Sequence, residues 1–80
     1  MIKLTFFKSK DCLACIEVLP IIKKFKGVKI VDVDKKAGLE KADKKGIKSL
    51  PTLVVEKDSK ERWIVGSHTE QEYTEKIKNI

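Results

Sequence analysis

The sequence predicts an α/β fold with the element order β-α-β-α-β-β-α, in which three helices flank a four-stranded mixed sheet. In its first half, short runs rich in β-branched and aromatic residues alternate with runs whose apolar residues recur every three or four positions. In its second half, two apolar runs separated by a polar turn precede one further helical run. A strand that returns to its sheet through a helix runs parallel to the first, whereas a short turn makes an antiparallel hairpin, so a mixed sheet is expected.

The first half of the chain predicts two strands and two helices. Residues 2–7 are expected to form a strand, and residues 13–25 a helix with one apolar face. Pro20 lies inside this helix, where its ring removes one backbone donor at a cost of about 3 kcal/mol that packing must offset. Residues 28–33 predict the second strand, and residues 38–45 predict a short helix. The residues expected to face the core from this short helix are Leu39 and Ala42.

The second half predicts an antiparallel hairpin. Residues 52–56 and 61–65 are rich in apolar and β-branched side chains, and the polar residues 57–60 between them suit a turn. Gly66 then ends the last strand.

The final helix is predicted from a stripe of apolar residues near the end of the chain. Its start is open between two candidate caps, because Thr69 with Glu72 matches a capping box and Ser67 with Glu70 matches another. The residues of the stripe are Tyr73, Ile77 and Ile80.

Composition and charge limit the class of protein. Eighty residues with 41% hydrophobic side chains suffice for one domain, 1–80, and the apolar residues fall into short runs, so no membrane span is expected. The net charge is +6, yet 12 acidic residues are interspersed among the 18 basic ones, which indicates a solvated surface rather than one that binds nucleic acid. The first residues predict a strand and not a secretion leader, so a cytoplasmic protein is expected. The protein is also expected to be a monomer.

The two cysteines, Cys12 and Cys15, lie where the first strand passes into the first helix. They are too few for the disulfide framework of a secreted domain, and in a reducing compartment such a pair is more often catalytic or metal-binding. A zinc site needs about four ligands and His68 is the other strong candidate, which disfavours zinc within one chain and leaves open a cluster shared between two chains. Non-enzymatic alternatives are a pair that only packs or that senses redox state.

Three further features accompany the cysteine pair. Pro20 follows the second cysteine by five residues, the segment 47–53 (Ile-Lys-Ser-Leu-Pro-Thr-Leu) contains Pro51, and Gly66 ends the last strand. With Cys-x-x-Cys at the start of the first helix, these features make the chain resemble the thioredoxin and glutaredoxin superfamily over its whole length. It is most similar to a small, glutaredoxin-sized thioredoxin, and the resemblance implies the thioredoxin fold.

The chemistry of the motif and the resemblance together imply a redox site. Cys12 is expected at the helix N-terminus, where free backbone N–H groups and the helix dipole favour a thiolate that attacks a substrate disulfide. Cys15, one turn further on and more buried, then attacks Cys12 and releases the reduced substrate. By resemblance, a cis bond joins Leu50 to Pro51, the Leu50 backbone pairs with an extended substrate segment, and Gly66 leaves room for that segment. No cofactor is expected beyond the redox-active disulfide.

The implied function is a thiol–disulfide oxidoreductase that reduces protein disulfides, with a thioredoxin-reductase-type flavoprotein or glutathione as electron donor. The alternative is a glutathione-dependent glutaredoxin, but glutaredoxins carry a lysine where this chain has Ser9, and an acid after paired glycines where it has one glycine and no acid. The chain also departs from thioredoxins. Leu13 and Ala14 lie between the cysteines, Asp11 replaces the usual tryptophan, and Phe6 replaces an acid that larger thioredoxins bury.

Overall fold

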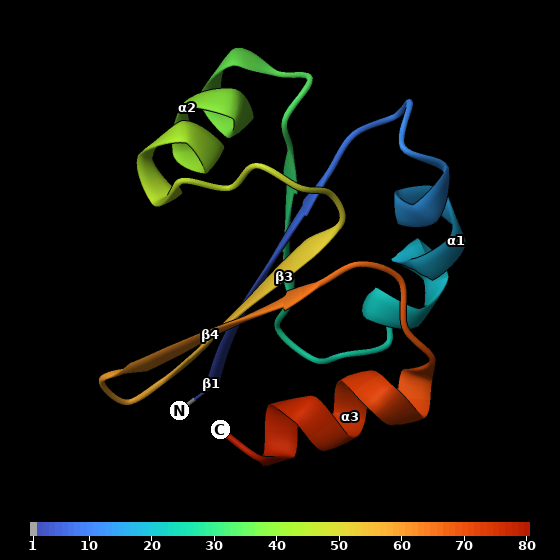
Figure 1. Cartoon of the computed structure of the whole chain (residues 1–80), viewed down its shortest axis with the longest axis vertical. Helices are drawn as coiled ribbons and strands as arrows, with labels where there is room; N and C mark the ends of the chain where they lie inside the picture. Colours follow the sequence, from blue (N-terminus) through green and yellow to red (C-terminus); the bar gives the residue numbers. More distant parts are fainter. Residues whose placement is uncertain (1) are drawn as a thin grey trace.

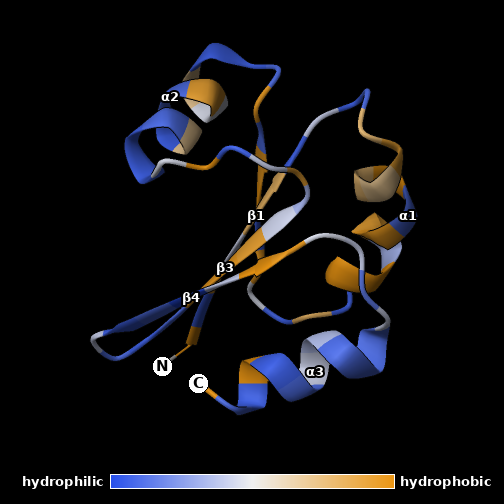
Figure 2. Cartoon of the chain, in the orientation of Figure 1, coloured by the Kyte–Doolittle hydropathy of each residue, from blue (hydrophilic) through white to orange (hydrophobic). Residues whose placement is uncertain are grey.

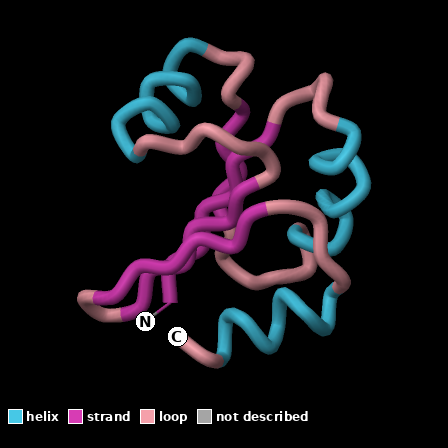
Figure 3. Tube along the Cα trace, viewed as in Figure 1, coloured by secondary structure: helices cyan, strands magenta, loops and turns pink. Residues whose placement is uncertain are grey.

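Four strands and three helices follow one another in the order β-α-β-α-β-β-α in the computed structural model, which describes residues 2–80. The strands form one sheet in which β1 and β2 are parallel and the other neighbouring pairs are antiparallel, in the order β2-β1-β3-β4 (Figure 1). The predicted element order and mixed sheet are thus confirmed, and Figure 3 shows the strands crossing the middle of the molecule with the helices outside them. The elements are β1 (Ile2–Lys8), α1 (Leu13–Ile22), β2 (Lys29–Asp32), α2 (Lys36–Lys45), β3 (Thr52–Lys57), β4 (Lys60–Val65) and α3 (Glu70–Lys78).

The helices cover both faces of the sheet, with α1 and α3 on one face and α2 on the other (Figure 1). Neighbouring residues of β1 divide between these faces, since Phe6 belongs to the core cluster under α1 and α3, whereas Phe7 belongs to the smaller cluster under α2. The two-residue side-chain period of a strand requires this alternation. Apolar residues of the helices and the sheet pack against one another, and most of the ribbon of α2 and α3 is coloured as hydrophilic (Figure 2). The buried residues of the larger cluster are Leu4, Phe6, Val18, Ile22, Leu53, Val55, Ile64, Tyr73 and Ile77.

Helix α1 is shorter than predicted. The expected helix to residue 25 is wrong, because α1 ends at Ile22 and the N–H groups after its cap bond three residues back rather than four. The N–H of Phe25 donates to the Ile22 carbonyl at 3.1 Å, so a tight turn replaces the last helical turn. Phe25 still packs against the core, where its ring meets Tyr73 edge-on with 6.5 Å between centroids. Phe25 therefore reaches the core from a tight turn, although its spacing from the preceding apolar residues is that of a helix.

Helix α2 faces the sheet through only one of the two residues predicted to do so. Leu39 is 50% exposed, so its predicted core position is wrong, whereas Ala42 is buried as predicted. The residue that faces the sheet one turn before Ala42 is Gly38. A Cβ atom at Gly38 would overlap the carbonyl oxygen of Asp32 at the end of β2. The helix approaches β2 too closely for a side chain at this position, and a glycine carries no apolar signal for a pattern to detect.

Helix α3 begins at one of the two predicted caps. The N–H of Glu72 donates to the Thr69 hydroxyl oxygen at 3.1 Å, and the N–H of Thr69 donates to the Glu72 carboxylate at 2.9 Å, which is a complete capping box. These hydrogen bonds, first the one from the Thr69 backbone, hold the pKa of Glu72 below its usual value. Tyr73 and Ile77 are buried and Ile80 is half-buried, so the predicted stripe faces the core.

Candidate redox site

The two cysteines form a disulfide at the start of α1, with their Cα atoms 5.2 Å apart. Cys12 is the residue immediately before the helix and has an extended backbone, whereas Cys15 lies in the first helical turn. Cys15 is 1% exposed, and Cys12 is only partly buried. Another molecule therefore reaches the sulfur of Cys12 first, with Cys15 behind it.

A backbone amide of the helix points at the sulfur of Cys12. The N–H of Cys15 donates to the Sγ of Cys12 at 3.1 Å, so this side chain caps α1. The first turn contains no acidic residue, and no carboxylate there competes for the positive end of the helix dipole. The Cys12 sulfur thus lies where the backbone stabilises negative charge, as a nucleophilic sulfur requires.

Asp34 holds the loop that leads into Cys12, although no motif in the sequence marks it. Its carboxylate accepts hydrogen bonds from the Lys10 backbone N–H at 2.8 Å and from the Ser9 hydroxyl at 2.9 Å. These bonds, first the one from the Lys10 backbone, lower the pKa of Asp34. Because β1 and β2 are parallel and their last residues pair, the chain after β2 lies beside the loop after β1. The sequence does hold one signal for this contact, because the predicted crossover connection places the ends of the two strands side by side.

Acid is expected to release this loop. The folded-state pKa of Asp34 lies below its ordinary value of 3.8, so the stabilisation is fully present above 3.8 and is lost as the pH falls through the lower folded value. In an NMR titration, the Lys10 amide resonance should therefore shift with a midpoint below 3.8. Asp34→Asn should abolish this shift and speed exchange of the Lys10 amide at neutral pH. Asp11→Asn, in the same loop, is the matched control and should preserve the shift. A midpoint at or above 3.8 in the wild type would contradict the anchoring role.

The predicted site residues lie at one end of the sheet, where several strands begin or finish. Phe7 of β1 lies opposite Thr52 of β3, which in turn lies opposite Val65 of β4. The chain after β1, the chain before β3 and the chain after β4 therefore leave the sheet at the same end. Figure 1 shows the loops before β3 and after β4 turned toward α1. The site residues carried by these three segments are Cys12, Cys15, Leu50, Pro51 and Gly66.

Hydrogen bonds tie the loop before β3 to the loop after β4. The peptide bond between Leu50 and Pro51 is cis, and Pro51 is buried. The N–H of Gly66 donates to the Pro51 carbonyl at 2.9 Å, and the Tyr73 hydroxyl donates to the Gly66 carbonyl at 3.0 Å. Burial raises the pKa of this Tyr73 hydroxyl, which keeps it a donor at neutral pH. The backbone N–H and carbonyl of Leu50, by contrast, take part in none of the backbone hydrogen bonds found between residues 2 and 80.

The backbone conformation at Gly66 requires a glycine. Its φ is +93°, in the left-handed region that side chains other than glycine rarely adopt. No atom lies within 4 Å of the place where its Cβ would stand, so the space beside it is open. That open space is compatible with the predicted passage of a substrate segment, which stays a prediction.

No family model and no curated protein matches the sequence. Solved structures do match the fold. A thioredoxin pre-protein of Schistosoma mansoni is 27% identical, with 98% of this chain and 77% of that chain covered and a TM-score of 0.76. Thioredoxin O2 of Arabidopsis thaliana, in its oxidised state, is 21% identical, with 100% and 75% covered and a TM-score of 0.78. A thioredoxin of Malassezia sympodialis is 22% identical, with 98% and 73% covered and a TM-score of 0.76. The chain has the thioredoxin fold.

With its Cys-x-x-Cys disulfide, this thioredoxin-fold chain fits the thioredoxin-like superfamily. The fold and the disulfide together support thiol–disulfide oxidoreductase activity. The position where larger thioredoxins are expected to bury an acid holds Phe6, whose side chain is fully buried in the core.

Two apolar side chains stand in solvent beside the cysteines of this thioredoxin fold. Leu13 lies between the cysteines and is 82% exposed, and Ile16 follows Cys15 and is 55% exposed. Adjacent apolar side chains next to a reactive sulfur suit contact with a partner molecule.

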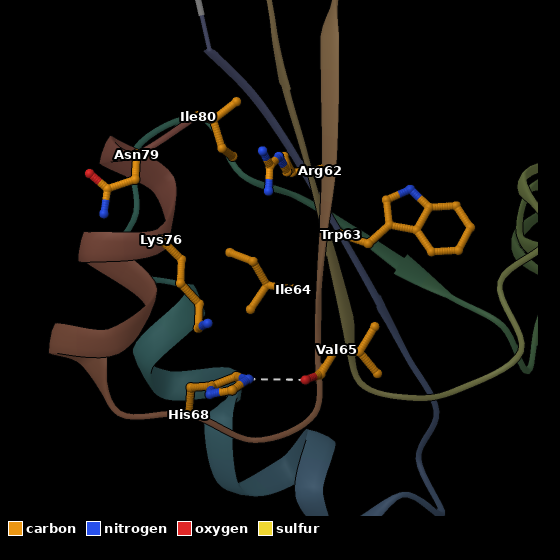
Figure 4. Close-up of a pocket in the computed structure, with 8 residues that line it drawn as sticks. All are labelled: Arg62, Trp63, Ile64, Val65, His68, Lys76, Asn79 and Ile80. Carbon is orange, nitrogen blue, oxygen red and sulfur yellow. Dashed lines mark hydrogen bonds between the residues drawn. The ribbon is translucent and has the colours of Figure 1, made fainter.

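A cavity of about 300 Å³ lies between β4 and α3 and is not lined by either cysteine (Figure 4). Ile64 points from β4 toward α3, whereas Trp63 points to the opposite side of the strand. The Nε2 atom of His68 lies 2.9 Å from the Val65 carbonyl oxygen, and the His68 ring meets Tyr73 edge-on with 5.4 Å between centroids. His68 is therefore a side chain packed near the start of α3.

The described part of the chain offers the disulfide as its reactive group. Within residues 2–80, no three His, Cys, Asp or Glu side chains are grouped so that they could hold a metal ion. The helices of the same range are all too short or too polar to cross a bilayer.

Proposed function

We propose that this protein reduces the disulfides of other proteins by dithiol exchange through Cys12 and Cys15. The observation that carries the proposal is the amide of Cys15 directed at the partly exposed Cys12 sulfur, 3.1 Å away, with Cys15 buried behind it. This geometry gives the two sulfurs different tasks. The accessible sulfur attacks, and the buried sulfur resolves.

The reaction begins from the dithiol form. The Cys12 thiolate attacks one sulfur of a substrate disulfide, which forms a Cys12–substrate disulfide and expels the other substrate sulfur as a thiolate that takes a proton from water. Cys15 then loses its proton to water and attacks the Cys12 sulfur, which forms the Cys12–Cys15 disulfide and expels the second substrate thiolate, which also takes up a proton. The substrate gains two electrons and two protons, and this chain is left oxidised. Water carries both protons because Phe6 occupies the position of the buried acid.

Substrate binding is proposed to use the backbone of Leu50. Its N–H and carbonyl have no backbone hydrogen-bond partner within residues 2–80. Leu50 immediately precedes Pro51, whose carbonyl accepts the hydrogen bond from the Gly66 N–H. An extended substrate segment pairing with Leu50 would add one short strand-like contact next to the cysteines. Leu13 and Ile16 would contact apolar residues that flank the substrate disulfide.

The cycle needs a donor of two electrons to restore the dithiol. We propose a flavoprotein of the thioredoxin reductase type, or glutathione, for this role. The reaction requires no further cofactor. A reductant of this kind works in a reducing compartment, so we place the protein in the cytoplasm. We also propose that it acts as a monomer.

The test compares two substrates under single-turnover conditions. The reduced protein is mixed either with a folded protein that carries one accessible disulfide or with a peptide–glutathione mixed disulfide, and the released thiols are measured by mass spectrometry. The rate constant for the protein disulfide should be larger by about tenfold or more, a difference of about 1.4 kcal/mol in activation free energy. A preference for the glutathione adduct that survives Cys15→Ser would replace the proposal with a glutaredoxin. Failure to reduce either substrate would leave a non-enzymatic module.

A further inference from the structure

Lysines from three distant parts of the sequence meet in one pocket on the α2 side of the sheet. The pocket has a volume of about 270 Å³ and lies between α2 and the strands β1, β2 and β3. In the sequence these lysines are up to 42 positions apart and suggest only a dispersed basic surface. The lining residues are Lys3, Thr5, Phe7, Lys29, Lys41, Lys44, Lys45 and Glu56.

The pocket carries more positive charge than its carboxylates can balance. Its one acidic lining residue, Glu56, pairs with Lys45 at 3.4 Å, and Lys45 also pairs with Glu61 at 2.6 Å. None of the ion pairs found between residues 2 and 80 includes the remaining four lysines. Those four are Lys3, Lys29, Lys41 and Lys44.

Three of these lysines, Lys41 with Lys29 and Lys3, are close enough for their charges to repel. The Lys29 side chain beside Lys41, and Lys3 further away, lower the pKa of Lys41. Such repulsion opposes folding, because the three residues come from β1, β2 and α2 and approach one another only in the folded chain. An anion bound between them would remove this cost.

We propose that this pocket binds a compact oligophosphate, either free or as the phosphate tail of a nucleotide. Its volume of about 270 Å³ is just below the roughly 300–1,000 Å³ of pockets that enclose drug-sized ligands, so a small, highly charged group suits it better than a large one. The four lysines, which come from β1, β2 and α2, line one pocket and match an anion with several charges, and lysine binds phosphate as a point charge. The half-buried Thr5 hydroxyl, which makes no hydrogen bond found within residues 2–80, is an additional donor on β1.

The pocket and the redox site can be tested separately. Lys3 lies near the start of β1, and the cysteines follow the other end of that strand. The five steps along the strand from Lys3 to Lys8 span about 17 Å. Binding is therefore measured directly on the oxidised protein, with no disulfide reduction in the assay, so that failure of this proposal and failure of the redox proposal remain distinguishable.

The experiment is isothermal titration calorimetry with sodium tripolyphosphate, pyrophosphate and ATP at constant ionic strength, which is needed because salt screens such charges. The pocket variant is Lys29→Gln with Lys41→Gln, and the matched control with the same loss of charge is Lys23→Gln with Lys26→Gln. Wild type and control should bind tripolyphosphate with equal Kd, and the pocket variant should bind about tenfold or more weakly.

Tripolyphosphate should also raise the Tm of wild type and control, because it binds the folded state. Without ligand, the pocket variant should melt at a higher temperature than the control, since it lacks the repulsion.

Two outcomes support the site and identify its ligand. Equal Kd values for ATP and tripolyphosphate would show that the phosphates alone are recognised, and tighter binding of ATP would indicate a nucleotide. Two outcomes would overturn the proposal. One is the absence of saturable binding at millimolar concentrations. The other is equal weakening in the pocket and control variants, which would show a diffuse basic surface of the kind that attracts nucleic acid.

Discussion

Cys12→Ser is expected to abolish disulfide reduction, and Cys15→Ser is expected to trap the chain as a mixed disulfide with its substrate. A serine hydroxyl is not ionised at neutral pH, so loss of the attacking sulfur should lower the rate by on the order of 10³ or more. With serine at position 15 the attack by Cys12 still occurs, but no sulfur resolves the adduct. Non-reducing electrophoresis followed by mass spectrometry of tryptic peptides should find the substrate bound to Cys12.

Each variant has the other as its control, because both lack the disulfide and each retains one sulfur. Both should show the circular dichroism spectrum of the reduced wild-type protein. The assignment of roles fails if the adduct forms on Cys15, or if Cys12→Ser retains the wild-type rate. It also fails if reagents that alkylate thiols modify Cys15 in the folded, reduced protein before Cys12, since burial of Cys15 is the basis for its second place in the reaction.

Gly38→Ala is expected to lower the free energy of unfolding by about 2–3 kcal/mol, which is the opposite of what helix propensity predicts. In an ordinary helix the exchange of glycine for alanine stabilises by about 1 kcal/mol. Here the added Cβ would meet the carbonyl oxygen of Asp32, a backbone atom that cannot rotate away as the end of a flexible side chain can. Either α2 must move off β2 or the end of β2 must shift.

Urea unfolding of the oxidised proteins measures this effect. The control is Ala37→Gly at the exposed neighbouring position of α2, which should cost about 1 kcal/mol through propensity alone. The close approach of α2 to β2 is contradicted if Gly38→Ala raises the free energy of unfolding. Because Asp32 precedes Asp34 by two residues, the variant should also disturb the Lys10 amide that Asp34 holds.

Much of the fold could be predicted because its signals are local. The hairpin from β3 to β4 follows from two apolar runs and a polar turn, and the capping box of α3 involves Thr69 and Glu72, only three residues apart. The position of Cys12 before α1 follows in the same way, from a strand pattern that ends and a helix pattern that begins. In each case the interacting groups are near neighbours along the chain.

The two helices that differ from the sequence prediction do so because of tertiary contacts. Phe25 meets the spacing of a helix but reaches the core from a tight turn, and Tyr73, against which it packs, lies far along the chain. Leu39 was expected inside because it is apolar, yet the contact with β2 is made by Gly38, a residue without a side chain. Apolar spacing shows which residues prefer burial, and it does not show how closely two elements approach.

By itself, the sequence determined the order of the elements, the mixed sheet and the cysteine pair at the start of α1. Only the tertiary structure decided that Asp34 holds the loop before Cys12, that Gly66 binds Pro51, and that lysines of β1, β2 and α2 share one pocket. The physical reason is the range of the interactions. Strand periods, turns and caps are made within a few residues, whereas these contacts join segments more than ten residues apart and exist only once the sheet has formed.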